Sequence, residues 1–336
     1  MFLNASNLYS FPGGWRPADS ETLQPDAGLN RQEEALLIYN YTTQTCRTIA
    51  GNEEELEIWR ITIFQDCGTS SCLLDVTLGL ASLHRILLAP TTKQKYAQAA
   101  IHYQHRALQS YTQELRLLNG ENCHVLLACS ILLSVLAMSM SAGHHEMTPT
   151  PAVETLSSAC SLLVGARTVT ETYSAILMST PYRTLLEQLP LYSDPMAGED
   201  VGRAMQELRW YATNAQVNDP WQIEKYHSAI DALDQSFERL ARRMSIGAIL
   251  VSLSTTNAPS TDFLREHDCV MMLILVHYGA LYIQLDTWWA REYGSRLVQE
   301  LSHRLHSRDE KWISTTRWAR SKAVESLNFP DDPGRN

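Results

Sequence analysis

The chain has 336 residues, of which 45% are hydrophobic and 19% charged, and its formal net charge is −10 at pH 7. This length allows one large domain or two modest ones, and the composition excludes disordered, collagen-like and solenoid classes. The acidic balance argues against nucleic acid as the main partner, because nucleic-acid binding needs a surplus of positive charge.

The seven cysteines are scattered, and no C-x-x-C spacing occurs. This pattern predicts buried reduced thiols, without disulfides and without a zinc site. Residues 1–17 lack a basic segment followed by an apolar run, so no signal peptide is predicted. We therefore expect a cytoplasmic, or at least intracellular, location.

Helical patterns fill most of the chain. Residues 1–29 are rich in proline and glycine and predict an irregular arm, whereas residues 30–326 predict one helical domain and residues 327–336 a tail. No stretch alternates with period two for long enough to indicate a strand. The predicted fold is all-α, a single compact domain of about ten helices around two buried apolar helices.

Capping signals mark several expected helix starts. Asn30 and Asn52 are each followed by a glutamate three residues later, the capping-box spacing, while Thr150-Pro151 and Asp219-Pro220 place proline at a first helical position. The expected helices cover residues 30–50, 52–63, 71–87, 92–118, 123–140, 150–178, 199–217, 219–244, 262–285, 287–306 and 309–326, with a short segment at 181–188 and a break at 255–260.

Two segments are strongly apolar, and residues 123–140 are apolar on every side. Residues 123–140 approach the length of a membrane span, but we favour a buried core helix and no span, because the rest of the chain is amphipathic. Residues 262–285 form the second such segment. We expect both at the centre of the domain.

Sequence signatures of common catalytic sites are missing. No phosphate-binding loop, dinucleotide fingerprint, nucleophile elbow or H-E-x-x-H occurs, and the aspartate-rich motifs of metal-dependent terpene cyclases are also missing. The acidic run Glu53–Glu55 is interpreted as a helix first turn that complements the helix dipole. We therefore expect no cofactor and no metal.

Polar groups inside the apolar helices are the more informative residues. His277, Tyr278 and Tyr282 interrupt the second apolar segment, and His84 follows another apolar run. Each donor could be satisfied within the protein, or the set could orient an apolar ligand in a pocket. Met138, Met272, Trp288 and Trp289 are candidate pocket walls, with core packing as the alternative for each methionine.

A family resemblance emerges from several short segments in order. These are Tyr41-Thr42-Thr43-Gln44-Thr45-Cys46, Trp59, Leu78–His84, Tyr103–Leu108, Val276–Leu281, Trp288-Trp289, Gly294 and Trp312. Together they resemble the regulatory domain of fungal zinc-cluster transcription factors, most closely the sterol-uptake-control type, from about residue 33 to 320. The resemblance implies an all-α domain with a deep apolar pocket for a sterol-like ligand.

The chain also departs from that family. Its regulators carry an N-terminal cluster of six cysteines with a basic linker, and the first hundred residues here contain only Cys46, Cys67 and Cys72. We therefore expect no direct binding of nucleic acid. Relatives without the DNA-binding module are candidates for a different role as stand-alone cyclases.

The main hypothesis is a cofactor-free cyclase of fungal specialised metabolism. It would hold an apolar terpenoid or polyketide in one folded conformer for an intramolecular Diels–Alder-type step. The rate would rise because the reacting groups are held close together and in the right orientation. His277, Tyr278 and Tyr282 are the expected catalytic hydrogen-bond donors, and the expected substrate-binding residues are His84, Met138, Met272, Trp288 and Trp289.

Two alternatives stay open. One is a non-catalytic regulator that senses a sterol or terpenoid and acts through a partner protein, with a nuclear location. The other is a gene model that lacks its N-terminal module. A homo-oligomer is compatible with each hypothesis.

Overall fold

The described residues of the computed structural model are 29–141, 150–186, 196–215, 219–253 and 268–327. They form helices, turns and short connections, and no β-strand occurs among them, which confirms the all-α class. Fourteen α-helices lie in these ranges, 11 of them with seven or more residues, close to the expected number of about ten.

The first half of the chain contains most of the short elements. They are α1 (Arg31–Thr43), η2 (Thr45–Ile49), α2 (Glu53–Glu57), η3 (Ile58–Thr62), α3 (Ile63–Asp66), α4 (Ser71–Leu88), η4 (Pro90–Thr92), α5 (Lys93–Leu115), α6 (Cys123–Ser141) and α7 (Ala152–Leu177). The second half contains η5 (Pro181–Leu186), α8 (Glu199–Thr213), α9 (Pro220–Ala241), α10 (Ile246–Leu253), α12 (Cys269–Gln284), α13 (Trp288–His306), α14 (Lys311–Thr315) and α15 (Arg317–Leu327).

The predicted capping residues begin their helices. Asn30 and Glu33 form a complete capping box on α1, the Asn52 side chain accepts the Glu55 N–H on α2, and Asp219 caps α9. At α7 the cap position is Pro151, one residue later than expected. These signals act within one helical turn, which explains why they can be recognised in a sequence.

Three expected helices are divided. The 30–50 helix ends at Thr43 and continues as the tighter η2, and the 309–326 helix is interrupted at Thr316. The 52–63 helix contains the π-helical turn η3. The expected arm at 1–29, the break at 255–260, the beginning of the 262–285 helix and nearly all of the tail lie outside the described residues.

The helix that begins at Asp219 ends earlier than expected. Arg243 has a left-handed φ of 53°, its N–H donates to Leu240 O, and Met244 N–H donates to Arg239 O, each at 3.0 Å. These two bonds are the Schellman pattern that ends a helix, with arginine where glycine is usual. The chain therefore turns and begins the separate helix α10 at Ile246.

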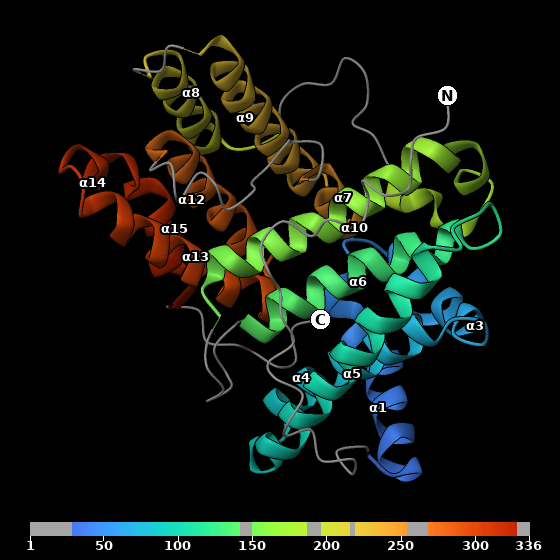
Figure 1. The fold of residues 1–336 in the computed structure, drawn as a ribbon. Coiled ribbons are helices and arrows are strands. Elements are labelled where there is room, and N and C mark those ends of the chain that lie inside the picture. Colours follow the sequence, from blue (N-terminus) through green and yellow to red (C-terminus); the bar gives the residue numbers. More distant parts are fainter. Residues whose placement is uncertain (1–28, 142–149, 187–195, 216–218, 254–267, 328–336) are drawn as a thin grey trace.

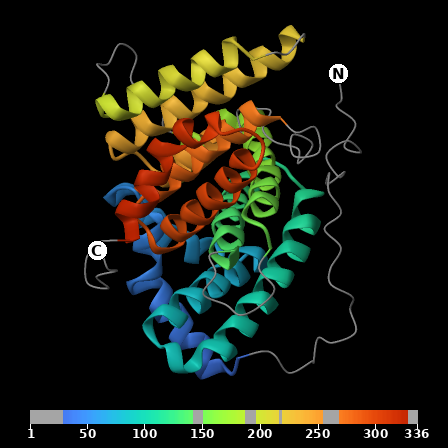
Figure 2. The same cartoon turned by 90° about the vertical axis from the view of Figure 1, so that its left-hand side faces the viewer.

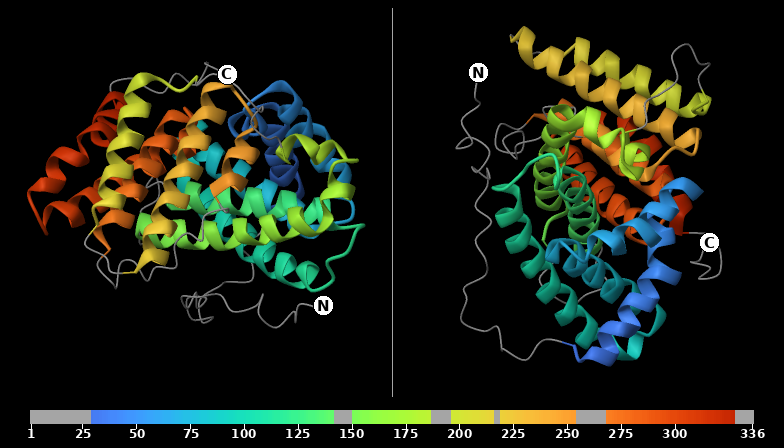
Figure 3. Two further views of the ribbon diagram at one scale, coloured as in Figure 1. Left: turned by 90° about the horizontal axis from the view of Figure 1, so that it is seen from above. Right: turned by 90° about the vertical axis from the view of Figure 1, so that its right-hand side faces the viewer.

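The helices are arranged in layers. Helices α8 and α9 form an antiparallel pair at one end of the molecule, and α1, α4 and α5 lie at the opposite end (Figures 1 and 2). Helices α6 and α7 run side by side between these ends (Figure 3). Helix α13 packs against both of them, and α12, α14 and α15 pack against α13.

Two apolar helices form the centre, as predicted. Nearly every residue of α6 and α12 is buried, with Leu132 and Ile274 at 0% exposure. Helices α4 and α6 are long and apolar enough to cross a membrane by length and composition. However, 72% and 83% of their most apolar windows are buried against other helices, as in the core of a water-soluble protein.

Helices α12 and α13 cross at two glycines. A Cβ atom built on Gly294 would lie 2.5 Å from Gly279 O, and one on Gly279 would lie 2.7 Å from Val298 Cγ2. Both positions therefore need glycine because the two backbones touch there. This crossing fixes the turn between the helices, which lies at the cavity described below.

We expect Gly294→Ala to destabilise the protein by about 1–2 kcal/mol, because the added methyl group forces the two backbones apart. Gly202→Ala on α8 is the control, since nothing lies within 4 Å of its Cβ position. Alanine there should stabilise the protein by up to about 1 kcal/mol. Urea unfolding of both variants measures the two changes, and equal effects would contradict the close crossing.

Candidate functional site

The three residues predicted as catalytic donors are buried in α12. His277 Nδ1 lies 2.9 Å from Leu273 O, and the imidazole stacks on Trp318 with ring centroids 5.4 Å apart. Burial lowers the pKa of His277 to about 4, so the ring is neutral at pH 7 and its Nδ1–H can donate to the carbonyl.

The two tyrosines face other elements. Tyr278 Oη donates to Ala229 O of α9 at 3.1 Å, and the Tyr282 ring makes an edge-to-face contact with Tyr293 of α13 at 5.3 Å. His277, Tyr278 and Tyr282 thus contact α15, α9 and α13 respectively. Their assignment as catalytic donors stays a prediction.

Three of the predicted binding residues come together around η2. His84 Nδ1 lies 2.9 Å from Thr45 Oγ1, and its ring stacks on Trp288 with centroids 5.6 Å apart and planes 3° apart. Trp288 Nε1 donates to Thr48 Oγ1 and Trp289 Nε1 to Thr48 O, at 3.2 and 3.0 Å. This cluster joins α4, η2 and the start of α13. The His84 imidazole is half-buried, and burial lowers its pKa to about 4.

The two predicted wall methionines lie in the core. Met138 of α6 is 0% exposed and Met272 of α12 is 1% exposed. Neither lines the cavity described next, nor do His277, Tyr278 and Tyr282. Their role in ligand binding stays a prediction.

A cavity of about 580 Å³ lies next to the His84 cluster. It is bounded by the start of α8, the end of α9, the start of α10, the end of η2 and the turn between α12 and α13. Its volume is in the range of small-molecule sites. The larger apolar side chains that line it are Val201, Phe237, Leu240, Met244, Ile246, Ile249 and Leu285.

Polar groups also line this cavity. Gln284 and Thr287, which flank the α12–α13 turn, both line it, and Gln284 Nε2 and Thr287 Oγ1 are buried without a hydrogen-bond partner. Arg47 and Arg243 add exposed guanidinium groups. Asp286, which has a left-handed φ of 55°, pairs with Arg291.

A buried carboxylate supports the cavity wall from behind. Glu55 is 0% exposed, and its carboxylate accepts hydrogen bonds from the N–H groups of Gly51, Ile246 and Gly247 at 2.7 to 2.8 Å. Burial raises the pKa of Glu55, and hydrogen bonds from the backbone oppose that rise. Glu55 lies in the first turn of α2, as expected, but its side chain caps α10.

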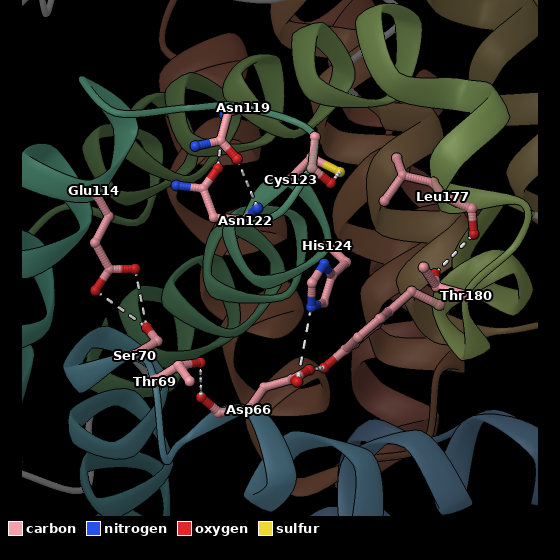
Figure 4. Close-up of polar contacts among 12 residues, drawn as sticks. Asp66, Thr69, Ser70, Glu114, Asn119, Asn122, Cys123, His124, Leu177 and Thr180 are labelled. Carbon is pink, nitrogen blue, oxygen red and sulfur yellow. Dashed lines mark hydrogen bonds and ion pairs between the residues drawn. The ribbon is translucent and has the colours of Figure 1, made fainter.

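A second polar cluster joins α3, α6 and η5. Tyr182 Oη donates to Asp66 Oδ2 at 2.5 Å, and His124 Nε2 lies 3.7 Å from Asp66 Oδ1, as Figure 4 shows for the histidine. Burial acts to raise the pKa of Asp66, but the interactions with His124 and Tyr182 lower it below its ordinary value. The cluster ties the beginning of α6 to its neighbours.

Sequence reasoning did not identify Gln284, Thr287, Arg47, Arg243 or Glu55 as site residues. Gln284 and Thr287 flank the predicted end of an apolar helix, next to Trp288, and that position was the available signal. For Arg243 and Glu55 no local pattern signals the role, because their partners are set by the tertiary fold.

The comparisons with known proteins give one family. Residues 36–159 match the model of the fungal specific transcription factor domain, which supports the resemblance to fungal transcription regulators. The match runs from α1 into α7 and includes Arg47, Gly51 and Glu55. Searches of curated proteins and of solved structures found no match.

Proposed function

We propose that this chain is a non-catalytic regulatory domain of the fungal transcription-factor type, which senses a sterol- or terpenoid-like ligand and acts through a partner protein in the nucleus. The observation that carries the proposal is the match of residues 36–159 to the fungal specific transcription factor domain. No DNA-binding segment is assigned to the chain in this proposal, so the partner would supply DNA binding.

The arrangement of the buried donors also supports this function over cyclisation. A pericyclic catalyst needs donors that converge on one substrate. His277 and Tyr278 instead donate to backbone carbonyls of two different helices, and these bonds stabilise the core. The cavity beside η2 could hold a ligand, and the predicted catalytic donors do not line it.

The proposal predicts the effect of deleting the gene in the fungus that encodes it. A set of transcripts should fall together, including those of neighbouring genes, and a plasmid copy of the wild-type gene should restore them. RNA sequencing measures this response, and mass spectrometry of the same cultures gives the metabolite profile.

The two functions give opposite results in this experiment. If transcripts hold steady while one product is replaced by an uncyclised precursor or by a mixture of isomers, the chain is a cyclase and the regulatory proposal is wrong. A plasmid copy with His277→Phe and Tyr278→Phe adds a second readout: it should restore the transcripts, because the proposal gives these side chains only a structural role.

A further inference from the structure

The turn between α12 and α13 presents two unsatisfied polar groups at a cavity. Thr287 is 7% exposed, its Oγ1 has no hydrogen-bond partner, and it caps α13 without a side-chain bond to that helix. Gln284 Nε2 is equally without a partner. Burying a polar group without a hydrogen-bond partner costs free energy of folding. Such a group in a folded protein therefore calls for an explanation, and binding of a ligand is one.

These two groups select the chemistry of a ligand. Both residues line the cavity, and binding a ligand through them requires a rotation about their side-chain bonds that turns the buried hydroxyl and amide groups toward the bound molecule. A threonine hydroxyl can donate and a glutamine amide has two N–H donors. Together they favour a ligand whose polar end carries acceptor oxygens.

The charge around the cavity favours an anionic ligand end. Arg47 and Arg243 both line it, and within the described ranges neither forms an ion pair with a carboxylate. Asp286, the acidic lining residue, is already paired with Arg291. Guanidinium groups bind carboxylates through two parallel hydrogen bonds.

The rest of the cavity wall comes from two helix ends and from apolar side chains. Arg243 and Asp286 are the two residues other than glycine with positive φ in the described part of the chain, and both line this cavity. Each positive φ belongs to a helix end, because Arg243 follows α9 in the Schellman pattern and Asp286 follows the last turn of α12. The remaining walls, including Phe237, Leu240 and Ile249, are apolar.

We infer that this cavity binds an apolar carboxylic acid, with the carboxylate at Thr287, Gln284 and Arg243 and the hydrocarbon body against the end of α9 and the start of α10. This inference rests on the proposed function in one respect, since the acid would be the sensed ligand. It narrows that ligand from a sterol- or terpenoid-like molecule in general to one with an acidic end.

Isothermal titration calorimetry on the purified full chain at pH 7.5 tests the inference. The probes are farnesoate, farnesol and farnesylamine, which share one isoprenoid body and differ only in the polar end. We expect farnesoate to bind at least about tenfold more tightly than farnesol and farnesylamine, because a charged hydrogen bond adds to the shared apolar contacts.

Two variants locate the carboxylate. Thr287→Val removes one hydroxyl and should weaken farnesoate binding about fivefold. Arg243→Asn removes the guanidinium while keeping a residue that tolerates positive φ, and it should weaken binding by a similar factor and reduce its dependence on salt. Thr77→Val and Arg320→Gln are controls outside the cavity lining and should bind farnesoate like the wild type.

Circular dichroism and thermal unfolding confirm that each variant is folded before its affinity is compared. Farnesol binding as tight as farnesoate, unchanged affinity in both cavity variants, or no saturable farnesoate binding would each overturn the inference. The proposed regulatory function fails on a different observation, namely steady transcripts in the deletion strain.

Discussion

Replacement of Glu55 by glutamine should lower the free energy of unfolding by about 3 kcal/mol. The carboxylate accepts three backbone N–H bonds in a fully buried place, and bonds to a charged acceptor contribute about 1.5–3 kcal/mol each. Glutamine keeps the shape but replaces one acceptor oxygen with an N–H₂ group. That group must face a backbone N–H, whichever way the amide is turned.

The loss should be large because Glu55 joins distant parts of the chain. Its partners Ile246 and Gly247 are 191 and 192 residues away, so the bonds hold the start of α10 against α2. Without the carboxylate, the first N–H groups of α10 lose their acceptor in a buried setting. The cavity wall that α10 forms should then loosen as well.

Glu54→Gln provides the matched control. Glu54 precedes Glu55 in the same first turn of α2 but is exposed, so its replacement should change the free energy of unfolding by less than about 0.5 kcal/mol. Urea unfolding at pH 7.5 measures both variants. A Glu55→Gln effect as small as that of Glu54→Gln would mean that the carboxylate is not the cap of α10.

The comparison of Glu53, Glu54 and Glu55 shows what a sequence can and cannot reveal. Their position in a helix first turn could be predicted, because the preceding Asn52 is a strong local signal. The burial of Glu55 alone among the three could not be predicted, because it depends on α10, which begins nearly 200 residues further along the chain. The same holds for α10, whose separation from α9 depends on a left-handed arginine.

The central helices were predictable for a different reason. Segment 123–140 is apolar on all sides and segment 262–285 is strongly apolar, and such segments are expected to be buried wherever the other helices lie. Their burial could therefore be expected without knowledge of topology. The direction in which each polar side chain points could not be expected in the same way. Tyr278 and Tyr282 are one helical turn apart, yet Tyr278 contacts α9 and Tyr282 contacts α13.

The candidate cavity combines residues from inside and outside the family match. Arg47 and Gly51 lie within residues 36–159, whereas Thr287, Gln284 and Arg243 lie far outside them. The first group lies next to the motif Tyr41–Cys46 that carries the resemblance, but that motif contains neither residue. The second group becomes a site only when α9, α10 and the α12–α13 turn are brought together, which explains why sequence reasoning selected Trp288 and missed its neighbour Thr287.

Acidification should destabilise the protein through His277. Burial holds the pKa of this imidazole at about 4, against an ordinary value of 6.5 that applies to the unfolded chain. As pH falls below about 6.5, the unfolded chain binds a proton that the folded state does not. The stabilisation is therefore complete above the unfolded pKa and is lost progressively as pH falls toward 4.

The expected loss from His277 is about 2 kcal/mol between pH 7.5 and pH 5.0. Other groups also contribute: His84 acts in the same direction, while Asp75, whose pKa is raised to about 6 by burial, opposes it. His277→Phe isolates the effect, because it keeps a ring against Trp318 and cannot be protonated, and the other groups cancel in the difference. We expect the unfolding free energy of this variant to fall by about 2 kcal/mol less than that of the wild type over the same interval.

His303→Phe is the control for this measurement. His303 lies on the exposed side of α13, so its removal should leave the wild-type pH dependence unchanged. Urea titrations at pH 7.5 and 5.0 give the free energies for all three proteins. Equal pH dependence in the wild type and His277→Phe would show that the imidazole takes up a proton as readily in the folded state as in the unfolded chain, and so would contradict the lowered pKa of His277. The expected difference would instead identify His277 as a core residue whose burial requires neutrality, consistent with its structural role in the proposed regulator.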